Sequence, residues 1–136
     1  MAIVRAFIVE DNPTIRENLI GTLREVARVE PVGEAETEWE GARWLTQHPA
    51  QWDLAVVDLF LKEGSGLRVL EACRDRAPAQ KVVVLSNHAT PDLRWKCGQL
   101  GADAVFDKAT EIEDLIDFCL RRRQEGFSAP PAMPLP

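Results

Sequence analysis

Five polar residues of this chain could together carry out phosphoryl chemistry, although they lie far apart in the sequence. They are Glu10, Asp11, Asp58, Ser86 and Lys108. Three carboxylates offer only oxygen ligands, and such a set suits a hard divalent cation such as Mg²⁺. A carboxylate beside a cation can attack phosphorus and form an acyl phosphate. An ammonium and a hydroxyl would then neutralise and bind the transferred phosphoryl oxygens.

Asp58 is the best candidate for the attacking carboxylate. It directly follows the apolar run Leu54–Val57, and it precedes a loop over residues 59–66 whose glycines allow close approach. Each polar residue also has an ordinary explanation when taken alone. The acid pair could be solvated near a helix start, Asp58 could be a turn residue, and Lys108 could lie on the surface. The set is informative only if one fold brings its members together.

The sequence alternates five times between an apolar run and a stretch of helical periodicity. The apolar runs cover residues 3–9, 29–33, 54–57, 81–86 and 104–106. They are continuously apolar rather than alternating, which is typical of parallel strands covered by helices on both faces. Five strand–helix units of this size predict a doubly wound α/β domain with a five-stranded parallel sheet and five helices.

Three helices carry specific predictions. The first begins with Asn12 as the capping residue and Pro13 at the first helical position. Its buried stripe is expected to contain Ile15, Leu19, Leu23, Val26 and Ala27. A second helix is expected to begin at Glu36. The helix after Gly66 is expected to reach almost to Pro78, with a buried face of Val69, Leu70, Cys73 and Ala77.

The polar residues come at the carboxyl ends of the predicted strands. The first run ends at Glu10 and Asp11, the third at Asp58, the fourth at Ser86 and the fifth just before Lys108. In an open parallel sheet, ligands bind beyond the carboxyl ends of the strands. We therefore expect all five side chains at one edge of the sheet. Because clustered carboxylates repel each other unless a cation compensates them, we expect Mg²⁺ at this edge.

These motifs resemble the receiver domain of bacterial two-component response regulators, of the stand-alone type. The residues that carry the resemblance are Glu10-Asp11, Val56 to Leu61 with Gly64 and Gly66, Val83 to Ser86, and Gly101 to Asp103 through Lys108. The resemblance implies a flavodoxin-like sheet with strand order 2-1-3-4-5. We predict a receiver domain over residues 1–124. A Pro-rich tail over residues 125–136 is expected to be disordered.

The resemblance also implies a function. Asp58 would accept a phosphoryl group from a phosphohistidine of a histidine kinase or a histidine phosphotransfer protein. The implied Mg²⁺ ligands are Glu10, Asp11, Asp58 and the backbone carbonyl of Phe60. Lys108 would pair with the phosphoryl oxygens and Ser86 would bond one of them. Such a chain is a phosphoacceptor module rather than an enzyme, and it would signal by contacting a downstream protein.

Several positions depart from the family pattern, among them Lys62 in place of a usual loop proline and Asn87 in place of a small residue after Ser86. The aromatic residue that often acts as a rotamer switch is replaced by Val105, and the neighbouring Phe106 would point to the other side of the sheet. The proline that usually follows the family lysine is replaced by Ala109. A cis bond before a residue other than proline costs about 2.5–4 kcal/mol, so we expect a trans bond here.

Two other functions stay open from the sequence. One is a scaffold of receiver fold that works without phosphorylation, with the acids retained as relics. The other is an aspartyl-phosphate phosphatase. Such enzymes generally need a second Asp two residues after the nucleophile as acid and base, and Phe60 stands at that position.

The amino-acid composition argues against some classes of partner. The chain has 22 acidic and 16 basic residues and a net charge of −6, which argues against a nucleic-acid partner because phosphate binding needs excess Lys and Arg. No apolar run approaches the roughly 20 residues that span a bilayer. The cysteines Cys73, Cys97 and Cys119 are odd in number and widely spaced, which favours neither a disulfide framework nor a zinc site. We expect a cytoplasmic protein without membrane contact.

Overall fold

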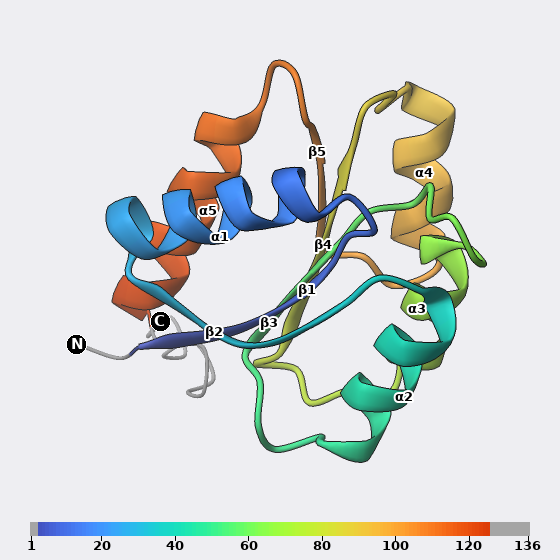
Figure 1. Cartoon of the computed structure of the whole chain (residues 1–136), viewed down its shortest axis with the longest axis horizontal. Coiled ribbons are helices and arrows are strands. Elements are labelled where there is room, and N and C mark those ends of the chain that lie inside the picture. Colours follow the sequence, from blue (N-terminus) through green and yellow to red (C-terminus); the bar gives the residue numbers. More distant parts are fainter. Residues whose placement is uncertain (1–2, 126–136) are drawn as a thin grey trace, which may run out of the picture.

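The computed structural model describes residues 3–125 and contains a five-stranded parallel sheet between two layers of helices (Figure 1). The strand order is β2-β1-β3-β4-β5. The strands are β1 (Val4–Val9), β2 (Val29–Ala35), β3 (Leu54–Val57), β4 (Lys81–Ser86) and β5 (Ala104–Asp107). This confirms the predicted doubly wound, flavodoxin-like α/β fold and its strand order.

Within residues 3–125, five helices cover the sheet, two on one face and three on the other. Helices α1 (Pro13–Ala27) and α5 (Ile112–Glu125) lie together on one face. Helices α2 (Glu38–Gln47), α3 (Gly66–Ala72) and α4 (Pro91–Gln99) cover the other. Among the described residues, no helix is long and apolar enough to cross a bilayer.

The central strands β1, β3 and β4 are buried along nearly their whole length, as their continuous apolar runs predict, whereas the edge strands β2 and β5 are partly exposed. Alternate residues of β1 point to opposite sides, so that Ile8 packs in the core under α1 and α5 while Phe7 packs in the core under α2 to α4. The same alternation separates Phe106, in the α1/α5 core, from Val105, against the other core. Val105 and Phe106 therefore face opposite sides, as predicted.

Side-chain caps set where the helices begin. Asn12 Oδ1 accepts a hydrogen bond from Ile15 N at 3.0 Å and Pro13 opens α1, as predicted. Helix α2 begins at Glu38 rather than at the predicted Glu36. The reason is that Thr37 is the capping residue, and its hydroxyl accepts from Glu40 N at 3.2 Å.

The buried face of α1 differs from the predicted stripe. Ile15 and Val26, predicted in the core, are 38% and 53% exposed. The buried residues are Arg16, Leu19, Leu23 and Ala27. The buried stripe is rotated because the Arg16 guanidinium donates to the buried carbonyl of Glu10 and pairs with Glu34 and Glu36 at the surface. A charged residue therefore occupies the core-facing position that the hydrophobic pattern gives to Ile15.

Helix α3 is shorter than its sequence pattern predicts. It ends at Ala72 with Cys73 as its cap, and Ala77 is exposed rather than on the buried face. Arg76 holds the chain in a turn here, because its guanidinium donates to Cys73 O at 3.2 Å and to Gly101 O at 2.7 Å. At the other end of the chain, α5 continues through Glu125. The rest of the expected tail lies outside the described residues.

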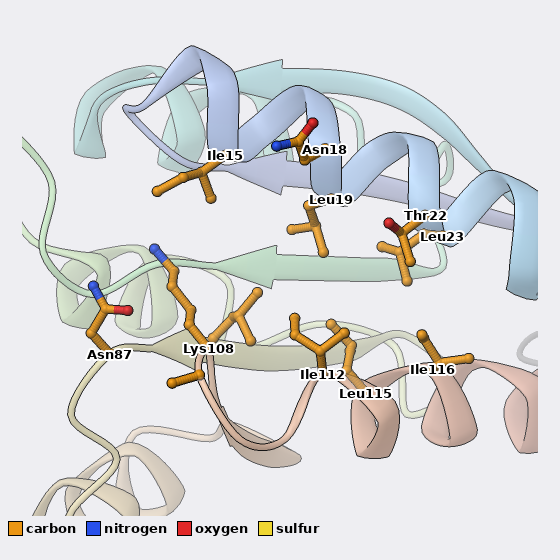
Figure 2. A pocket seen from close by; sticks show the side chains of 12 residues that line it. Ile15, Asn18, Leu19, Thr22, Leu23, Asn87, Lys108, Ile112, Leu115 and Ile116 are labelled. Carbon is orange, nitrogen blue, oxygen red and sulfur yellow. The ribbon is translucent and has the colours of Figure 1, made fainter.

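A mostly apolar groove of about 380 Å³ runs between α1 and α5 (Figure 2). Side chains from both helices line it, and the ammonium of Lys108 lies towards the end where Ile15 and Asn87 are found. Other lining residues are Leu19, Leu23, Ile112, Leu115 and Ile116. The groove therefore connects an apolar surface with the carboxyl edge of the sheet.

Candidate functional site

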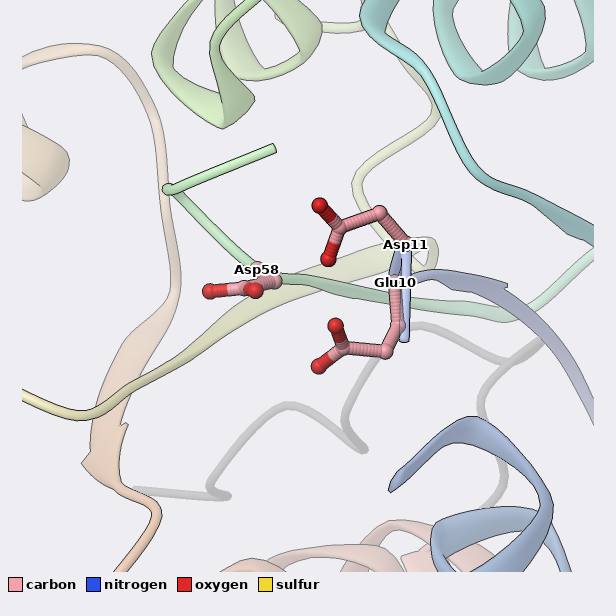
Figure 3. Close-up of side chains that lie close together, drawn as sticks. All are labelled: Glu10, Asp11 and Asp58. Carbon is pink, nitrogen blue, oxygen red and sulfur yellow. The ribbon is translucent and has the colours of Figure 1, made fainter. Parts of the chain in front are cut away.

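The ends of β1 and β3 bring three carboxylates together. Val9 of β1 pairs with Val57 of β3, so the residues that follow these two strands are neighbours. Figure 3 shows the side chains of Glu10 and Asp11 on one strand end and that of Asp58 on the other, gathered around a common space. One carboxylate oxygen of each lies within 4.8 Å of the others.

Backbone hydrogen bonds past the strand ends fix the two buried acids. Asp58 N donates to Val9 O at 2.9 Å, and Glu10 N donates to Ala35 O at 2.9 Å. The residues Glu10 and Asp58 are 3% and 6% exposed. Asp11 is half-buried and accepts a hydrogen bond from the backbone amide of Lys62 at 2.7 Å. The β3–α3 loop thus closes one side of the site.

Gly66 allows that loop to pass directly over the backbone of Asp58. A Cβ at this position would lie 2.7 Å from Leu59 Cα and closer still to Asp58 O, which no side chain can do. The Gly66 amide also donates to Leu59 O at 3.0 Å. This is the close approach that the loop glycines predict, and it explains why the loop can fold back on the end of β3.

Lys108 brings one positive charge to this group of acids. Its Nζ lies 2.6 Å from Glu10 Oε1 and 3.2 Å from Asp58 Oδ2. Burial opposes the charge of this ammonium, but its bonds to Glu10 and Asp58 outweigh burial and raise the pKa of Lys108. Burial also raises the pKa of Glu10, with the charge of Asp58 adding to it and Lys108 opposing it. The acids therefore share one ammonium and repel each other.

Ser86 ends β4, the strand beside β3, and Phe60 lies two residues after Asp58. Ser86 is completely buried at the end of β4; its carbonyl accepts from Lys108 N at 2.9 Å and its Oγ accepts from His88 N at 3.4 Å. It is therefore tied to the segment that carries the lysine. Phe60 N donates to Asp58 Oδ1 at 3.4 Å, and the Phe60 ring is exposed. The role of the Phe60 carbonyl as a ligand stays a prediction.

Arg94 of α4 is a residue of this edge that sequence reasoning missed. Its guanidinium donates to Ala89 O at 2.9 Å, to Val105 O at 2.8 Å and to Glu111 Oε1 at 2.5 Å. It thereby links the β4–α4 loop, β5 and the β5–α5 loop on either side of Ser86 and Lys108. An arginine in a polar stretch of helix gives no sequence signal of such contacts.

The peptide bond before Ala109 is trans, as expected. Throughout residues 3–125 the structure contains no cis peptide bond. The replacement of the family proline by Ala109 therefore leaves the segment after Lys108 in an ordinary backbone geometry.

The donor set fits Mg²⁺. Within the described part of the chain, the three residues that could hold an ion are Glu10, Asp11 and Asp58, which offer carboxylate oxygens and neither nitrogen nor sulfur. Mg²⁺ prefers such oxygen ligands and completes its shell with water or phosphate oxygens. Three carboxylates against one ammonium leave negative charge for a divalent cation to neutralise.

The fold and this acidic edge define a class of protein. The sequence matches the family described as "Response regulator receiver domain" over residues 6–119, and the chain belongs to that family. It is a receiver domain of two-component signalling systems, and receiver domains bind Mg²⁺ at an acidic pocket.

Its relatives include regulatory proteins of known name. The chain is 32% identical over 81 residues to "Photosynthetic apparatus regulatory protein RegA" of Rhodobacter capsulatus, which covers 60% of this chain and 44% of that protein. It is 31% identical over 124 residues to "Acid tolerance regulatory protein ActR" of Rhizobium meliloti. This aligned region covers 90% of this chain and 61% of ActR. The chain thus spans less than two thirds of either relative, and the expected stand-alone organisation stays a prediction.

Solved structures show the same fold. The receiver domain of the response regulator NarL from Mycobacterium tuberculosis superposes with a TM-score of 0.78 at 23% identity, covering 91% of this chain and 98% of that one. A CheY-like receiver domain protein from Methanospirillum hungatei superposes with a TM-score of 0.72 at 25% identity, covering 91% of this chain and 96% of that one.

Proposed function

We propose that Asp58 accepts a phosphoryl group from a phosphohistidine of a histidine kinase or histidine phosphotransfer protein, in a reaction that depends on Mg²⁺. The observation that carries this proposal is the placement of a buried Asp58 between two further acids and the ammonium of Lys108. A cytoplasmic location and the lack of a nucleic-acid partner stay predictions from the sequence.

The side chains divide the chemistry among themselves. An Asp58 carboxylate oxygen forms a bond to phosphorus, while the bond from phosphorus to the donor histidine nitrogen breaks and leaves its electron pair on that nitrogen. Lys108, already 3.2 Å from Asp58 Oδ2, is placed to neutralise the phosphoryl oxygens. Ser86 supplies a hydroxyl for one of those oxygens from the next strand end. The product is an acyl phosphate on Asp58.

Mg²⁺ would be held by Glu10, Asp11 and Asp58, with the Phe60 carbonyl as a further ligand. When bound, it supplies positive charge that offsets the charge of the incoming phosphoryl oxygens. The pair of acids at the end of β1 serves this purpose only if both carboxylates face Asp58, as they do in Figure 3.

The groove between α1 and α5 is the surface that supports docking of the phosphodonor. It lies beside Lys108, and Ile15 at its edge is partly exposed rather than buried in the core. An apolar groove that reaches Lys108, whose ammonium lies 3.2 Å from Asp58 Oδ2, fits a partner that must bring its phosphohistidine to Asp58.

The surface over α4 and β5 supports the role of signalling to a downstream protein. Trp95 of α4 is 69% exposed, which is unusual for so large an apolar side chain. Arg94, the preceding residue of α4, connects α4 to the loop that follows Ser86 and to the loop that carries Lys108. A change at the phosphoryl site can therefore reach the surface around Trp95 through one side chain.

The phosphorylation-independent scaffold and the phosphatase are less well supported. Relic acids would not need Lys108 within 2.6 Å of Glu10 and 3.2 Å of Asp58. Phosphatase turnover needs an acid two residues after the nucleophile, where this chain has the exposed ring of Phe60.

The test is to incubate the protein with phosphoramidate or acetyl phosphate and Mg²⁺ and to measure the mass of the intact protein. We expect the wild type to gain one phosphoryl group and Asp58→Asn to gain none. Asp53→Asn is the matched control, because Asp53 is similarly buried at the opposite edge of the sheet, and it should react like the wild type. Equal labelling of Asp58→Asn and the wild type would mean that another residue accepts the phosphoryl group and would overturn the proposal. No labelling of the wild type would also overturn it and would favour a scaffold.

A further inference from the structure

Arg16 is a buried arginine whose contacts all lie next to the acidic site. Its side chain is 8% exposed. Nη1 donates to the backbone carbonyl of Glu10 at 2.8 Å, in a fully buried hydrogen bond. Nη2 donates to Glu36 Oε1 at 3.2 Å, and Nε lies 3.3 Å from Glu34 Oε1. One guanidinium thus joins α1, the end of β1 and the end of β2.

The carbonyl that Arg16 holds belongs to the peptide unit between Glu10 and Asp11. This unit is planar, and it contains the Cα atoms of both residues. Holding its oxygen therefore fixes the orientation of the plane that carries both Cα atoms and restrains the positions from which the two carboxylate side chains leave the backbone. The backbone amide of Asn12, the capping residue of α1, adds a second tie, because it donates to Glu10 Oε2 at 3.1 Å. The acid pair is held in place from α1, although α1 contributes no ligand.

The positive charge of Arg16 is already compensated. Glu34 and Glu36 both lie within ion-pair distance of the guanidinium and are themselves about half exposed. Arg16 also donates to a carbonyl of Glu10 and not to its carboxylate, which is left to Lys108. Arg16 therefore takes no part in neutralising the three acids, and its contribution to the site is geometric.

We propose that Arg16 is a positioning residue, which aims the Glu10 and Asp11 carboxylates at the cation by holding the peptide unit between them. This inference rests on the proposed Mg²⁺-dependent function. Residues that orient metal ligands typically change metal affinity by about 10- to 100-fold when they are replaced.

Geometry and charge predict opposite effects of removing Arg16. If Arg16 acted only through its positive charge, Arg16→Met would remove a repulsion and would tighten Mg²⁺ binding. If it orients the acid pair, the same substitution frees the peptide unit and weakens Mg²⁺ binding. Arg16→Lys keeps the charge but loses the planar fork that reaches a carbonyl and two carboxylates together. If only charge matters, Arg16→Lys should bind Mg²⁺ as tightly as the wild type. If Arg16 positions the acids, Arg16→Lys should bind Mg²⁺ more weakly.

The experiment is a calorimetric titration of Mg²⁺ into the metal-free wild type, Arg16→Met and Arg16→Lys. We expect Arg16→Met to bind Mg²⁺ about 10- to 100-fold more weakly than the wild type. The Mg²⁺ affinity of Arg16→Lys should lie between those of Arg16→Met and the wild type. Arg24→Met is the matched control, because Arg24 is an exposed arginine of the same helix, and its Mg²⁺ affinity should equal that of the wild type.

A second readout separates positioning from a general loss of structure. In phosphorylation by acetyl phosphate, the Mg²⁺ concentration for half-maximal rate should rise in the Arg16 variants, while the rate at saturating Mg²⁺ should return close to that of the wild type. A purely structural role would lower the saturated rate and leave the half-maximal concentration unchanged.

Each outcome decides something. If Arg16→Met fails to fold, Arg16→Lys alone decides between geometry and charge. Mg²⁺ affinity in Arg16→Lys that is equal to or higher than in the wild type would overturn the inference and leave the proposed function intact. Lack of saturable Mg²⁺ binding by the wild type would instead overturn the Mg²⁺-dependent function, together with this inference.

Discussion

The acidic side chains at the two ends of the sheet differ in how their charge is balanced. At the amino end, Asp53 and Asp103 each have an arginine of their own: Arg5 Nε and Nη2 each donate to Asp53 at 3.1 Å, and Arg76 Nη2 donates to Asp103 at 2.7 Å. At the carboxyl end, the ammonium of Lys108 is shared by Glu10 and Asp58, with Asp11 alongside.

The difference shows which charges serve the fold and which serve a ligand. The arginines of the amino end also donate to backbone carbonyls, so their pairs tie together strands and loops and need no further partner. The carboxyl end keeps excess negative charge in a buried place, which costs stability unless a cation binds. A fold keeps such an imbalance at sites where function needs it.

Replacing Lys108 by Met should have the largest effect, because it removes the shared cation of the carboxyl end. We expect the free energy of unfolding of the metal-free protein to fall by about 3 kcal/mol, since buried carboxylates lose their partner. The melting temperature should fall by about 10 °C. Mg²⁺ should then raise the melting temperature of Lys108→Met by more than that of the wild type, because it replaces the lost charge.

Thermal melting with and without Mg²⁺ checks this prediction, and Lys96→Met serves as the control because Lys96 is exposed on α4. Equal stabilisation of the wild type and Lys108→Met by Mg²⁺ would mean that the ammonium and the cation do not serve the same acids.

Neutralising one buried aspartate at each end should give effects of opposite sign. In the metal-free protein, Asp58→Asn should raise the free energy of unfolding by on the order of 1 kcal/mol. The repulsion that it removes from Glu10 outweighs the loss of the 3.2 Å Lys108–Asp58 ion pair, and the 2.6 Å Lys108–Glu10 bond stays in place. Asp53→Asn should lower it by about 1 kcal/mol, because it weakens the bonds to Arg5.

Urea unfolding of the two variants in the presence of a chelator measures both changes. Two changes of the same sign would contradict the distinction between the balanced and the unbalanced end. Addition of Mg²⁺ should abolish the higher free energy of unfolding of Asp58→Asn, because the cation stabilises the wild type more than it stabilises this variant.

The smallest effect is expected at Glu111, an acid near the carboxyl end that does have an arginine. Its hydrogen bond from Arg94 holds the pKa of Glu111 below its usual range. A carboxyl group with a lowered pKa stabilises the fold above its ordinary pKa, and this contribution is lost as the pH falls through the lowered value. Glu111→Gln should therefore melt slightly below the wild type at neutral pH, and the two should converge in acid.

Melting curves between neutral pH and pH about 3 follow this convergence down to the lowered pKa range of a carboxyl group. The Glu111→Gln substitution keeps a side-chain oxygen that can accept from Asp107 N, as Glu111 Oε1 does at 2.9 Å, so the loss of charge is the main change. A difference that grows in acid would show that the Arg94 pair is not its source.

The sequence predicted the strands and the edge where the polar residues meet, because both depend on local pattern. Continuous apolar runs define buried strands, and the first polar residue after each run must lie at the carboxyl edge. The receiver resemblance supplied the strand order that makes Asp58 a neighbour of Glu10. The register of the sheet then sets these two residues side by side, because Val9 pairs with Val57.

Arg16 and Arg94 could not be predicted in the same way, because their partners are mostly backbone carbonyls and acids on other elements. Hydrophobic periodicity gave the core-facing position of α1 to Ile15. The buried residues of α1 have an equally helical spacing: Arg16, Leu19, Leu23 and Ala27. A pattern search that allowed an arginine on the buried face would have predicted this stripe. The early end of α3 was missed for a similar reason, since Arg76 closes a turn that the apolar pattern does not record.

The dependence of phosphoryl transfer on a cation tests the central claim most directly. The wild type is incubated with phosphoramidate in Mg²⁺ or in a chelator, and the mass of the intact protein is followed over time. The acidic carboxyl edge predicts that one phosphoryl group is gained in Mg²⁺ and that this gain is abolished by the chelator. Equal incorporation under both conditions would contradict the claim that these acids gather to bind a cation beside Asp58.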